Sequence, residues 1–219
     1  MSVATAERGK LLFGTSPQPL SFAKSLVARS YLVATPEGNA LIYSSQISPA
    51  DMEEITDRGA PVARFLNHWH EAMFEPGVDL IEGIPVTVGR DDRPETEVRM
   101  PVADTIDDRG FVLPGLEAIP TPGHTPGATA YLWESDGVRR LFAGDSVYMG
   151  ARGWQVAVLG DSDPVAYAES LELMATLEFD VLVPWAGPSD LHPVDRVTRD
   201  EGRRRMLKLA ERVRGGATG

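Results

Sequence analysis

The stretch LNHWHEAMF, residues 66–74, carries two histidines separated by a single residue. In an extended segment the side chains of residues i and i+2 point to the same side, so the imidazoles of His68 and His70 can converge on one ion while Trp69 points elsewhere. The apolar run VARFL at 62–66 predicts a short buried strand, which places the pair on the loop after its C-terminal end. Two hydrogen-bonded or surface histidines would give the same pattern, so a metal site needs further ligands elsewhere in the chain.

The other candidate ligands lie much later in the sequence. The chain contains no cysteine, which excludes thiolate ligands and leaves nitrogen and oxygen donors. His124 lies in TPGHTPG, residues 121–127, a Pro/Gly-rich turn between two predicted strands. Asp145 ends the apolar segment LFAGD, residues 141–145, where a carboxylate is unfavourable unless it is paired or bound to a cation.

The order of H-W-H, TPGHTPG and LFAGD along the chain resembles the metallo-β-lactamase-fold superfamily. The similarity is greatest to its glyoxalase II and sulfur-dioxygenase branches, whose motifs read HxHxDH, TPGHTxG and F-x-GD followed by PGH. SYLVATPEGNALIYSS, residues 30–45, is similar to the opening hairpin of the family, although Ser44 and Ser45 stand where an Asp and a Gly often follow. The resemblance spans about residues 25–190 and implies an α/β fold, a four-layer αβ/βα sandwich with the metals on loops at one edge, between two sheets.

The resemblance also implies which residues hold metal. His68, His70 and His124 match the ligands of the first metal ion, and Asp145 matches the carboxylate that bridges two ions in the family.

Three positions depart from the family pattern. Ala72, Met73 and Ala186 match the residues that bind only the second ion. Alanine has no donor atom, and a thioether is a poor ligand for Zn²⁺ or Fe²⁺ beside oxygen ligands. Because all three departures fall on one site, we expect a single divalent ion, with zinc preferred and Fe²⁺ as the alternative.

The implied function is that of a mononuclear hydrolase in which a metal-bound hydroxide attacks an ester, thioester or lactone. Asp145 is the candidate catalytic residue because it can take the proton or orient the water, and Glu71 or Glu75 could act instead, although both are expected to be solvated loop residues. Two alternatives stay open. One is an Fe(II) sulfur dioxygenase that uses His68, His124 and Asp145. The other is a non-catalytic binding or sensing module on the same fold.

Composition narrows the class of partner. The formal charge of −11 argues against a general nucleic-acid or membrane-surface binder. The N-terminus has no apolar core of signal-peptide length, and no apolar run approaches the ~18 residues of a membrane span. We therefore expect a cytoplasmic protein that acts on a small-molecule substrate, and nothing in the sequence indicates its oligomeric state.

The length suits one domain over residues 1–219, with an N-terminal extension at 1–24 and a basic helix at 195–214 whose charges form a solvated face. His192 could return to the site as a substitute ligand, but the following Pro193 favours a capping or surface role. A hairpin is predicted at 29–35 and 40–44, and helices at 48–59 and from 163. Further strands are predicted at 85–89, 97–102, 110–113, 116–121, 128–134, 138–145 and 180–187.

Overall fold

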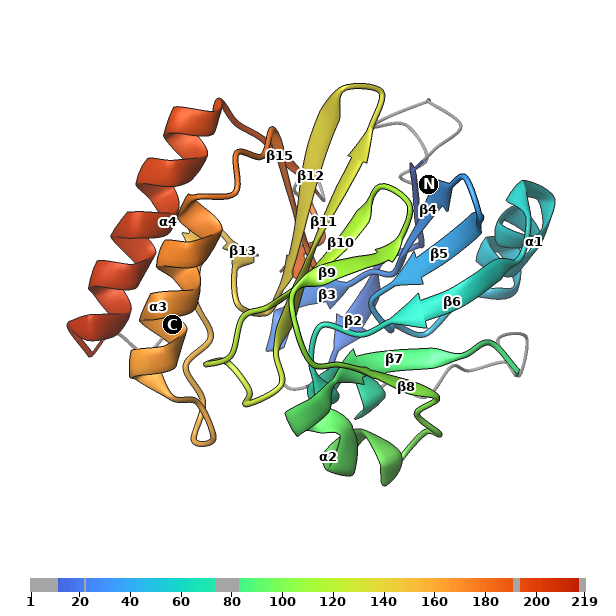
Figure 1. Cartoon of the computed structure of the whole chain (residues 1–219), viewed down its shortest axis with the longest axis horizontal. Helices are drawn as coiled ribbons and strands as arrows, with labels where there is room; N and C mark the ends of the chain where they lie inside the picture. Colours follow the sequence, from blue (N-terminus) through green and yellow to red (C-terminus); the bar gives the residue numbers. More distant parts are fainter. Residues whose placement is uncertain (1–11, 22, 74–82, 191–193, 217–219) are drawn as a thin grey trace.

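The structure is a computed structural model that describes residues 12–21, 23–73, 83–190 and 194–216. Two mixed sheets face each other, and helices cover their outer faces (Figure 1). The first sheet has the order β1 (Leu12–Gly14), β4 (Tyr31–Thr35), β5 (Gly38–Ile42), β6 (Pro61–Phe65), β7 (Val86–Gly89) and β8 (Asp104–Ile106). The second has the order β17 (Asp195–Arg196), β15 (Val181–Pro184), β12 (Val138–Gly144), β11 (Thr129–Ser135), β10 (Leu116–Pro120) and β9 (Gly110–Leu113).

The remaining strands form two small sheets. One joins β16 (Ala186–Pro188), β3 (Ala23–Ala28) and β2 (Gln18–Leu20), and the other pairs β13 (Tyr148–Gly150) with β14 (Gly153–Gln155). The α-helices are α1 (Pro49–Arg58), α2 (Arg93–Glu97), α3 (Pro164–Ala175) and α4 (Arg199–Arg214), and the short 3₁₀ helices include η1 (Trp69–Met73) and η3 (Arg90–Asp92).

Aromatic side chains fill the space between the two sheets. The rings of Tyr31, Tyr43 and Phe142 meet edge to face, with centroids 5.8–6.0 Å apart. The Tyr43 hydroxyl donates to the carbonyl of Val183 at 2.7 Å and accepts from the Gly144 N–H at 2.8 Å. A buried hydroxyl of the first sheet thus satisfies two backbone groups of the second, which fixes how the sheets sit against each other.

The helices bury apolar faces on the outer sides of the sheets. Met52 and Ile55 of α1 join Leu41 in a cluster on the first sheet. Leu171 and Met174 of α3, with Leu209 and Val213 of α4, join Leu141 in a larger cluster on the second. These outer helical layers confirm the predicted αβ/βα sandwich.

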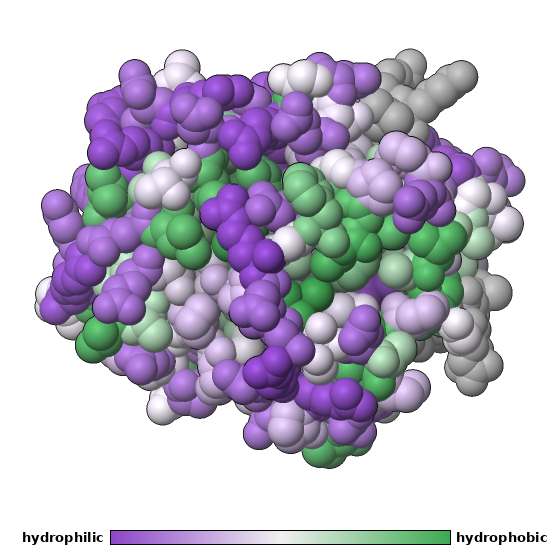
Figure 2. Space-filling view, in the orientation of Figure 1, coloured by the Kyte–Doolittle hydropathy of each residue, from purple (hydrophilic) through white to green (hydrophobic). Residues whose placement is uncertain are grey.

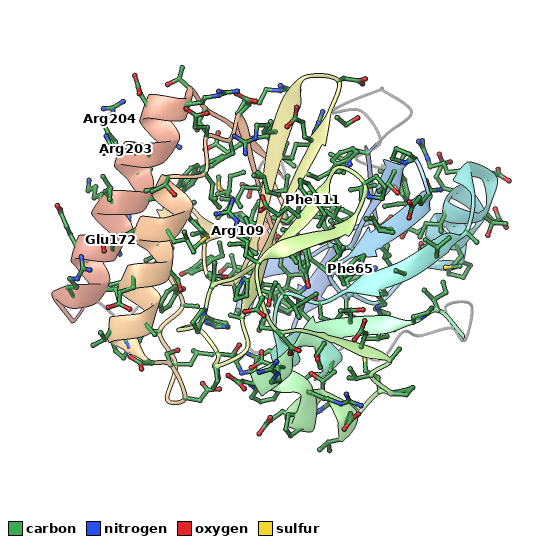
Figure 3. The ribbon with its side chains drawn as sticks, viewed as in Figure 1. Phe65, Arg109, Phe111, Glu172, Arg203 and Arg204 are labelled. Atoms are coloured by element: carbon green, nitrogen blue, oxygen red, sulfur yellow. The ribbon has the colours of Figure 1, made fainter. Side chains whose placement is uncertain are left out.

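The basic C-terminal helix faces solvent. Figure 3 shows Arg203 and Arg204 pointing away from the sheets, and hydrophilic residues dominate this side in Figure 2. Arg205 pairs with Asp195, and Arg214 pairs with Glu172 of α3. Such exposed pairs contribute little stability each, which agrees with the predicted solvated face. None of the described helices is both long and apolar enough to cross a membrane.

The local signals in the sequence predicted most of these elements. The hairpin β4–β5 turns at Pro36, as expected, and the Ser48 hydroxyl caps α1 by accepting from the Asp51 N–H at 3.1 Å. Asp163 caps α3 in the same way through Val165 and Ala166, whose N–H groups its carboxylate accepts.

Four assignments need correction. The strand predicted at 97–102 is wrong, because α2 occupies Arg93–Glu97 and a turn follows. The segment 180–187 is interrupted at Trp185, and its two halves join different sheets. Within the expected N-terminal extension, Leu12–Gly14 and Gln18–Leu20 form β1 and β2 and belong to the sheets. The predicted helix at 195–214 starts only at Arg199, after β17.

Candidate metal centre

The site lies where strands of the two sheets end close together. β6 ends one residue before Leu66, and β12 ends at Gly144. Gly144 has a φ of 57°, and a Cβ atom there would lie 1.8 Å from Oδ1 of Asn67. Only glycine allows this approach, which brings the residues after both strands to one edge of the sandwich.

Three imidazoles converge at this edge. One ligating atom each from His68, His70 and His124 can be chosen so that all lie within 4.8 Å of one another, and all three residues are buried. Nδ1 of His70 is 3.3 Å from Nε2 of His124. The ring of His68 lies 4.8 Å from that of His124 and 5.1 Å from that of His70, measured between centroids. The predicted convergence of the three histidines is therefore confirmed.

The local geometry of the His68–His70 pair differs from the prediction. η1 begins at Trp69, so His70 lies on a 3₁₀ turn and not on an extended segment. The two rings meet because the chain turns after β6, and their planes are 82° apart.

His124 is held by backbone groups around its loop. Its Nδ1 donates to the carbonyl of Ala157 at 2.7 Å, which leaves Nε2 free to accept. Gly123, with a φ of 137°, lets the loop lie against the first turn of α3, since a Cβ there would lie 2.4 Å from the Tyr167 nitrogen. The loop between β10 and β11 thereby presents one defined nitrogen to the site.

Burial keeps the three imidazoles neutral. Desolvation lowers the pKa of His68 well below its usual value, and the neighbouring His124 and His70 lower it further. Desolvation also lowers the pKa of His70 and takes the pKa of His124 to about 4. Neutral imidazole is the form that binds a metal ion, so the rings are ready for ligation at neutral pH.

Polar atoms that a cation would satisfy are present in the site. Nε2 of His68, which faces Asp145, and Oδ1 of Asp145 are buried without a hydrogen-bond partner. Oδ2 of Asp145 lies 3.8 Å from Nε2 of His68, and burial raises the pKa of Asp145 to about 7. Leaving such groups unpaired is costly, and a divalent ion bound by nitrogen and oxygen donors removes that cost. The donor set present fits such an ion.

Glu71 is not the solvated residue that the sequence predicted. Its side chain is fully buried, and its two carboxylate oxygens accept from the N–H groups of Ser44 and Asn67 at 2.7 and 2.9 Å. Desolvation raises the pKa of Glu71 well above its usual range, and the two backbone hydrogen bonds oppose that shift. Glu75 and His192 lie outside the described residues.

Sequence reasoning missed two further carboxylates. Asp92 is fully buried and accepts from the Trp69 N–H, the Thr125 hydroxyl and the Gly127 N–H, at 2.6–3.0 Å. It therefore connects the two loops that carry the histidines. Asp92 lies in a run of charged residues that follows the buried strand β7, and its place after that strand was the only available signal.

Asp161 is the second missed residue. Its Oδ2 lies 3.7 Å from Nε2 of His70, on the loop before α3, and its side chain is 41% exposed. Nothing in the sequence marked Asp161 as a residue that would lie near the histidines.

The family resemblance assigns Ala72, Met73 and Ala186 to the positions of a second metal ion's own ligands. Ala72 is buried in an apolar cluster with Leu66 and Val88. Met73 is 42% exposed, and Ala186 is buried in β16.

Comparison with known proteins agrees with this architecture. The structure is similar to a metallo-β-lactamase from Pontibacter korlensis, at 18% identity and a TM-score of 0.70 over 94% of this chain and 97% of that one. It is also similar to the metallo-β-lactamase FIM-1 from Pseudomonas aeruginosa in its mono-zinc form, at 16% identity and a TM-score of 0.72 over 94% and 93%. A third similar structure is a metallo-β-lactamase from Erythrobacter litoralis, at 16% identity and a TM-score of 0.71 over 94% and 95%.

At these identities the structural likeness establishes the fold alone. No curated protein matches the sequence. A family model described as the metallo-beta-lactamase superfamily matches residues 50–186, which is more than half of the chain and includes all three site histidines. The chain therefore belongs to the metallo-β-lactamase superfamily.

Proposed function

We propose that this protein is a hydrolase that uses one divalent metal ion, zinc in preference to iron. The observation that carries the proposal is the buried group of three imidazoles, whose ligating atoms all lie within 4.8 Å of one another. His68, His70 and His124 would hold the ion, with Asp145 beside them as a fourth ligand or as an acceptor for a nearby proton. Three neutral nitrogen ligands with one position left open are typical of catalytic zinc sites.

The residues around the three histidines favour one bound metal ion over two. Ala72 packs into an apolar cluster, and neither it nor Ala186 offers a donor atom. FIM-1, which shares the fold, has been crystallised in a mono-zinc form, so the architecture accommodates a single zinc in that protein.

In the proposed hydrolysis the metal ion and the protein side chains have different roles. A zinc ion held by these residues would act as a Lewis acid and would lower the pKa of its bound water to ~7. Asp145, on the loop after β12, places a carboxylate oxygen near His68 and can orient a water molecule or accept its proton. The Ala157 carbonyl holds the His124 ring in place, so that the reacting groups keep their geometry.

The proposed substrates are small molecules with an ester, thioester or lactone carbonyl. Because the similar solved structures are metallo-β-lactamases, a β-lactam belongs in the same test panel.

Hydrolysis of this panel by zinc-loaded protein tests the proposal. We expect turnover of at least one carbonyl substrate, abolished in His124→Ala and strongly reduced in Asp145→Asn. Arg203→Ala, on the exposed outer side of α4, serves as the control and should keep full activity. Undiminished turnover in His124→Ala contradicts the proposal, and a zinc-loaded wild-type protein that hydrolyses nothing in the panel favours a binding or sensing module.

A further inference from the structure

Glu71 is a buried carboxylate that the proposed reaction does not use. It lies on η1 directly after His70, and its side chain has no exposed surface. A charged side chain rarely occupies such a position unless its oxygens are satisfied by specific partners. Its surroundings therefore carry information about its role.

The carboxylate joins the ends of two neighbouring strands. Oε2 accepts from the Ser44 N–H after β5, and Oε1 accepts from the Asn67 N–H after β6. Oε1 also lies 3.2 Å from Nδ1 of His68, close to but not aligned for a hydrogen bond. Each oxygen thus faces at least one fixed donor, and His68 supplies the third polar neighbour.

A buried cation belongs to the same network of hydrogen bonds. Arg64 of β6 is buried and donates to the hydroxyl of Ser44, the residue whose N–H donates to Glu71. Two backbone N–H groups thus donate to the Glu71 carboxylate, and the Arg64 guanidinium fixes the side chain of one of the two donor residues.

The orientation of the His68 ring determines which of its two nitrogens is available to a metal ion. Neutral imidazole carries one proton, and the nitrogen that carries it cannot bind a metal ion. Nδ1 of His68 points to Glu71, while Nε2 lies 3.8 Å from Asp145 on the site side. Both nitrogens lack any other partner in the described structure.

We propose that Glu71 is the positioning residue of the metal centre, and that its carboxylate holds the proton of His68 on Nδ1 so that Nε2 remains free for the ion. His124 is fixed in the same tautomer by the Ala157 carbonyl, so two of the three ligands present Nε2. A ligating histidine commonly donates its other N–H to a carboxylate or carbonyl, and loss of that partner commonly weakens metal binding. The inference rests on the proposed metal site and adds a role for a residue that touches neither ion nor substrate.

The tautomer of His68 can be measured without any metal. Long-range ¹H–¹⁵N NMR of metal-free protein distinguishes the protonated ring nitrogen from the bare one, with resonances assigned by single histidine substitutions. We expect the wild-type His68 proton on Nδ1, and in Glu71→Gln a shift towards Nε2, because the amide NH₂ can donate to Nδ1. A wild-type spectrum with the proton on Nε2 overturns the inference, even if Glu71→Gln does not fold.

A matched control separates positioning from simple destabilisation. Asp92→Asn also removes a fully buried carboxylate beside these loops, but among the described residues Asp92 accepts its hydrogen bonds from two backbone N–H groups and a hydroxyl, and from no histidine ring. We expect both variants to lower the unfolding midpoint, and only Glu71→Gln to move the His68 proton. If the His68 proton lies on the same ring nitrogen in both variants, Glu71 does not position it.

Zinc affinity completes the test and separates this inference from the proposed function. We expect Glu71→Gln to bind zinc about 10- to 100-fold more weakly than the wild type, measured by competition with a chelating dye. If the wild type binds zinc and Glu71→Gln binds it equally well, the role of Glu71 is refuted while the metal site stands. If the wild type binds no zinc although its His68 carries the proton on Nδ1, the proposed function fails and the role of Glu71 in choosing the tautomer stands.

Discussion

At the scale of single residues, the two loops that carry the histidines share one buried carboxylate. Asp92 accepts from the N–H of Trp69, which lies between His68 and His70, and from the Thr125 hydroxyl and the Gly127 N–H, which follow His124 on its loop. Gly127 lies so close to it that a Cβ there would be 2.8 Å from the Asp92 carboxyl carbon. The position of each loop therefore depends on the other through Asp92.

Replacement of Asp92 by Asn should destabilise the fold. An amide retains one acceptor oxygen and turns an NH₂ group towards donors, so at least one buried donor loses its partner. We expect a loss of roughly 1–3 kcal/mol in the free energy of unfolding, measured by urea denaturation at pH 7. An unchanged midpoint refutes the assignment of Asp92 as the link between the loops.

Asp92 also predicts a pH dependence of stability. Burial raises the pKa of Asp92 in the folded protein to about 6, with the three hydrogen bonds opposing the shift, whereas an unfolded Asp has a pKa near ~3.9. The folded state therefore binds this proton more tightly, so the associated stability is complete below the unfolded pKa and is lost as the pH rises through about 6. The gap in unfolding free energy between wild type and Asp92→Asn should narrow from acid to neutral pH in urea titrations. If the difference in unfolding free energy between wild type and Asp92→Asn instead grows from acid to neutral pH, the pKa of Asp92 is not raised by folding.

At the scale of elements, the site depends on how closely the ends of β6 and β12 approach. Gly137 precedes β12 and Gly144 ends it, and both have a positive φ, of 70° and 57°. A Cβ at Gly137 would meet nothing within 4 Å, whereas one at Gly144 would collide with Asn67. The two glycines thus share a backbone cost and differ only in their steric surroundings.

Alanine substitutions at these two positions should separate the two effects. We expect Gly137→Ala to cost about 1 kcal/mol in unfolding free energy, from the left-handed backbone alone. Gly144→Ala should lower the unfolding free energy by roughly 1–3 kcal/mol more than Gly137→Ala, because Asn67 and the adjacent His68 must shift. The same shift should weaken zinc binding. Equal effects of the two substitutions on stability and zinc affinity disprove the close approach.

Elements with strong end signals were predictable from the sequence, and those without them were not. Pro36 and Gly38 mark the hairpin turn, and Ser48 and Asp163 cap their helices as expected. α2 was missed because it is short and apolar Val98 and Met100 after it suggested a strand, although Val98 is exposed.

The site was predictable only in part, for a related reason. The three histidines stood out because that residue type is rare in this chain and each lies on a loop that follows a predicted strand. The burial of Glu71 and Asp92 was not predictable, since charged side chains in polar loops are solvated unless distant backbone donors happen to meet them. Those donors, such as the N–H groups of Ser44 and Gly127, come together only in the folded chain.

At the scale of the whole molecule, a metal ion bound between the sheets would stabilise the fold. Its proposed ligands follow β6 of the first sheet and β10 and β12 of the second, so the ion would connect both halves of the sandwich. A ligand that binds only the folded state adds about 2.7 kcal/mol of stability at a hundredfold excess over its Kd. We expect zinc to raise the thermal midpoint of metal-free protein, and EDTA to reverse the rise. If zinc does not raise the thermal midpoint of the wild type, or raises that of His124→Ala equally, the ion does not connect the two sheets through this site.

The central claim is that one ion occupies the three-histidine site, and the metal content of the purified protein tests it most directly. Elemental analysis after expression in zinc-supplemented medium and extensive dialysis should give one zinc per chain for the wild type and none for His124→Ala. The sequence predicts that His192→Ala retains the ion. No bound zinc in the wild type, or two ions per chain, would contradict the account.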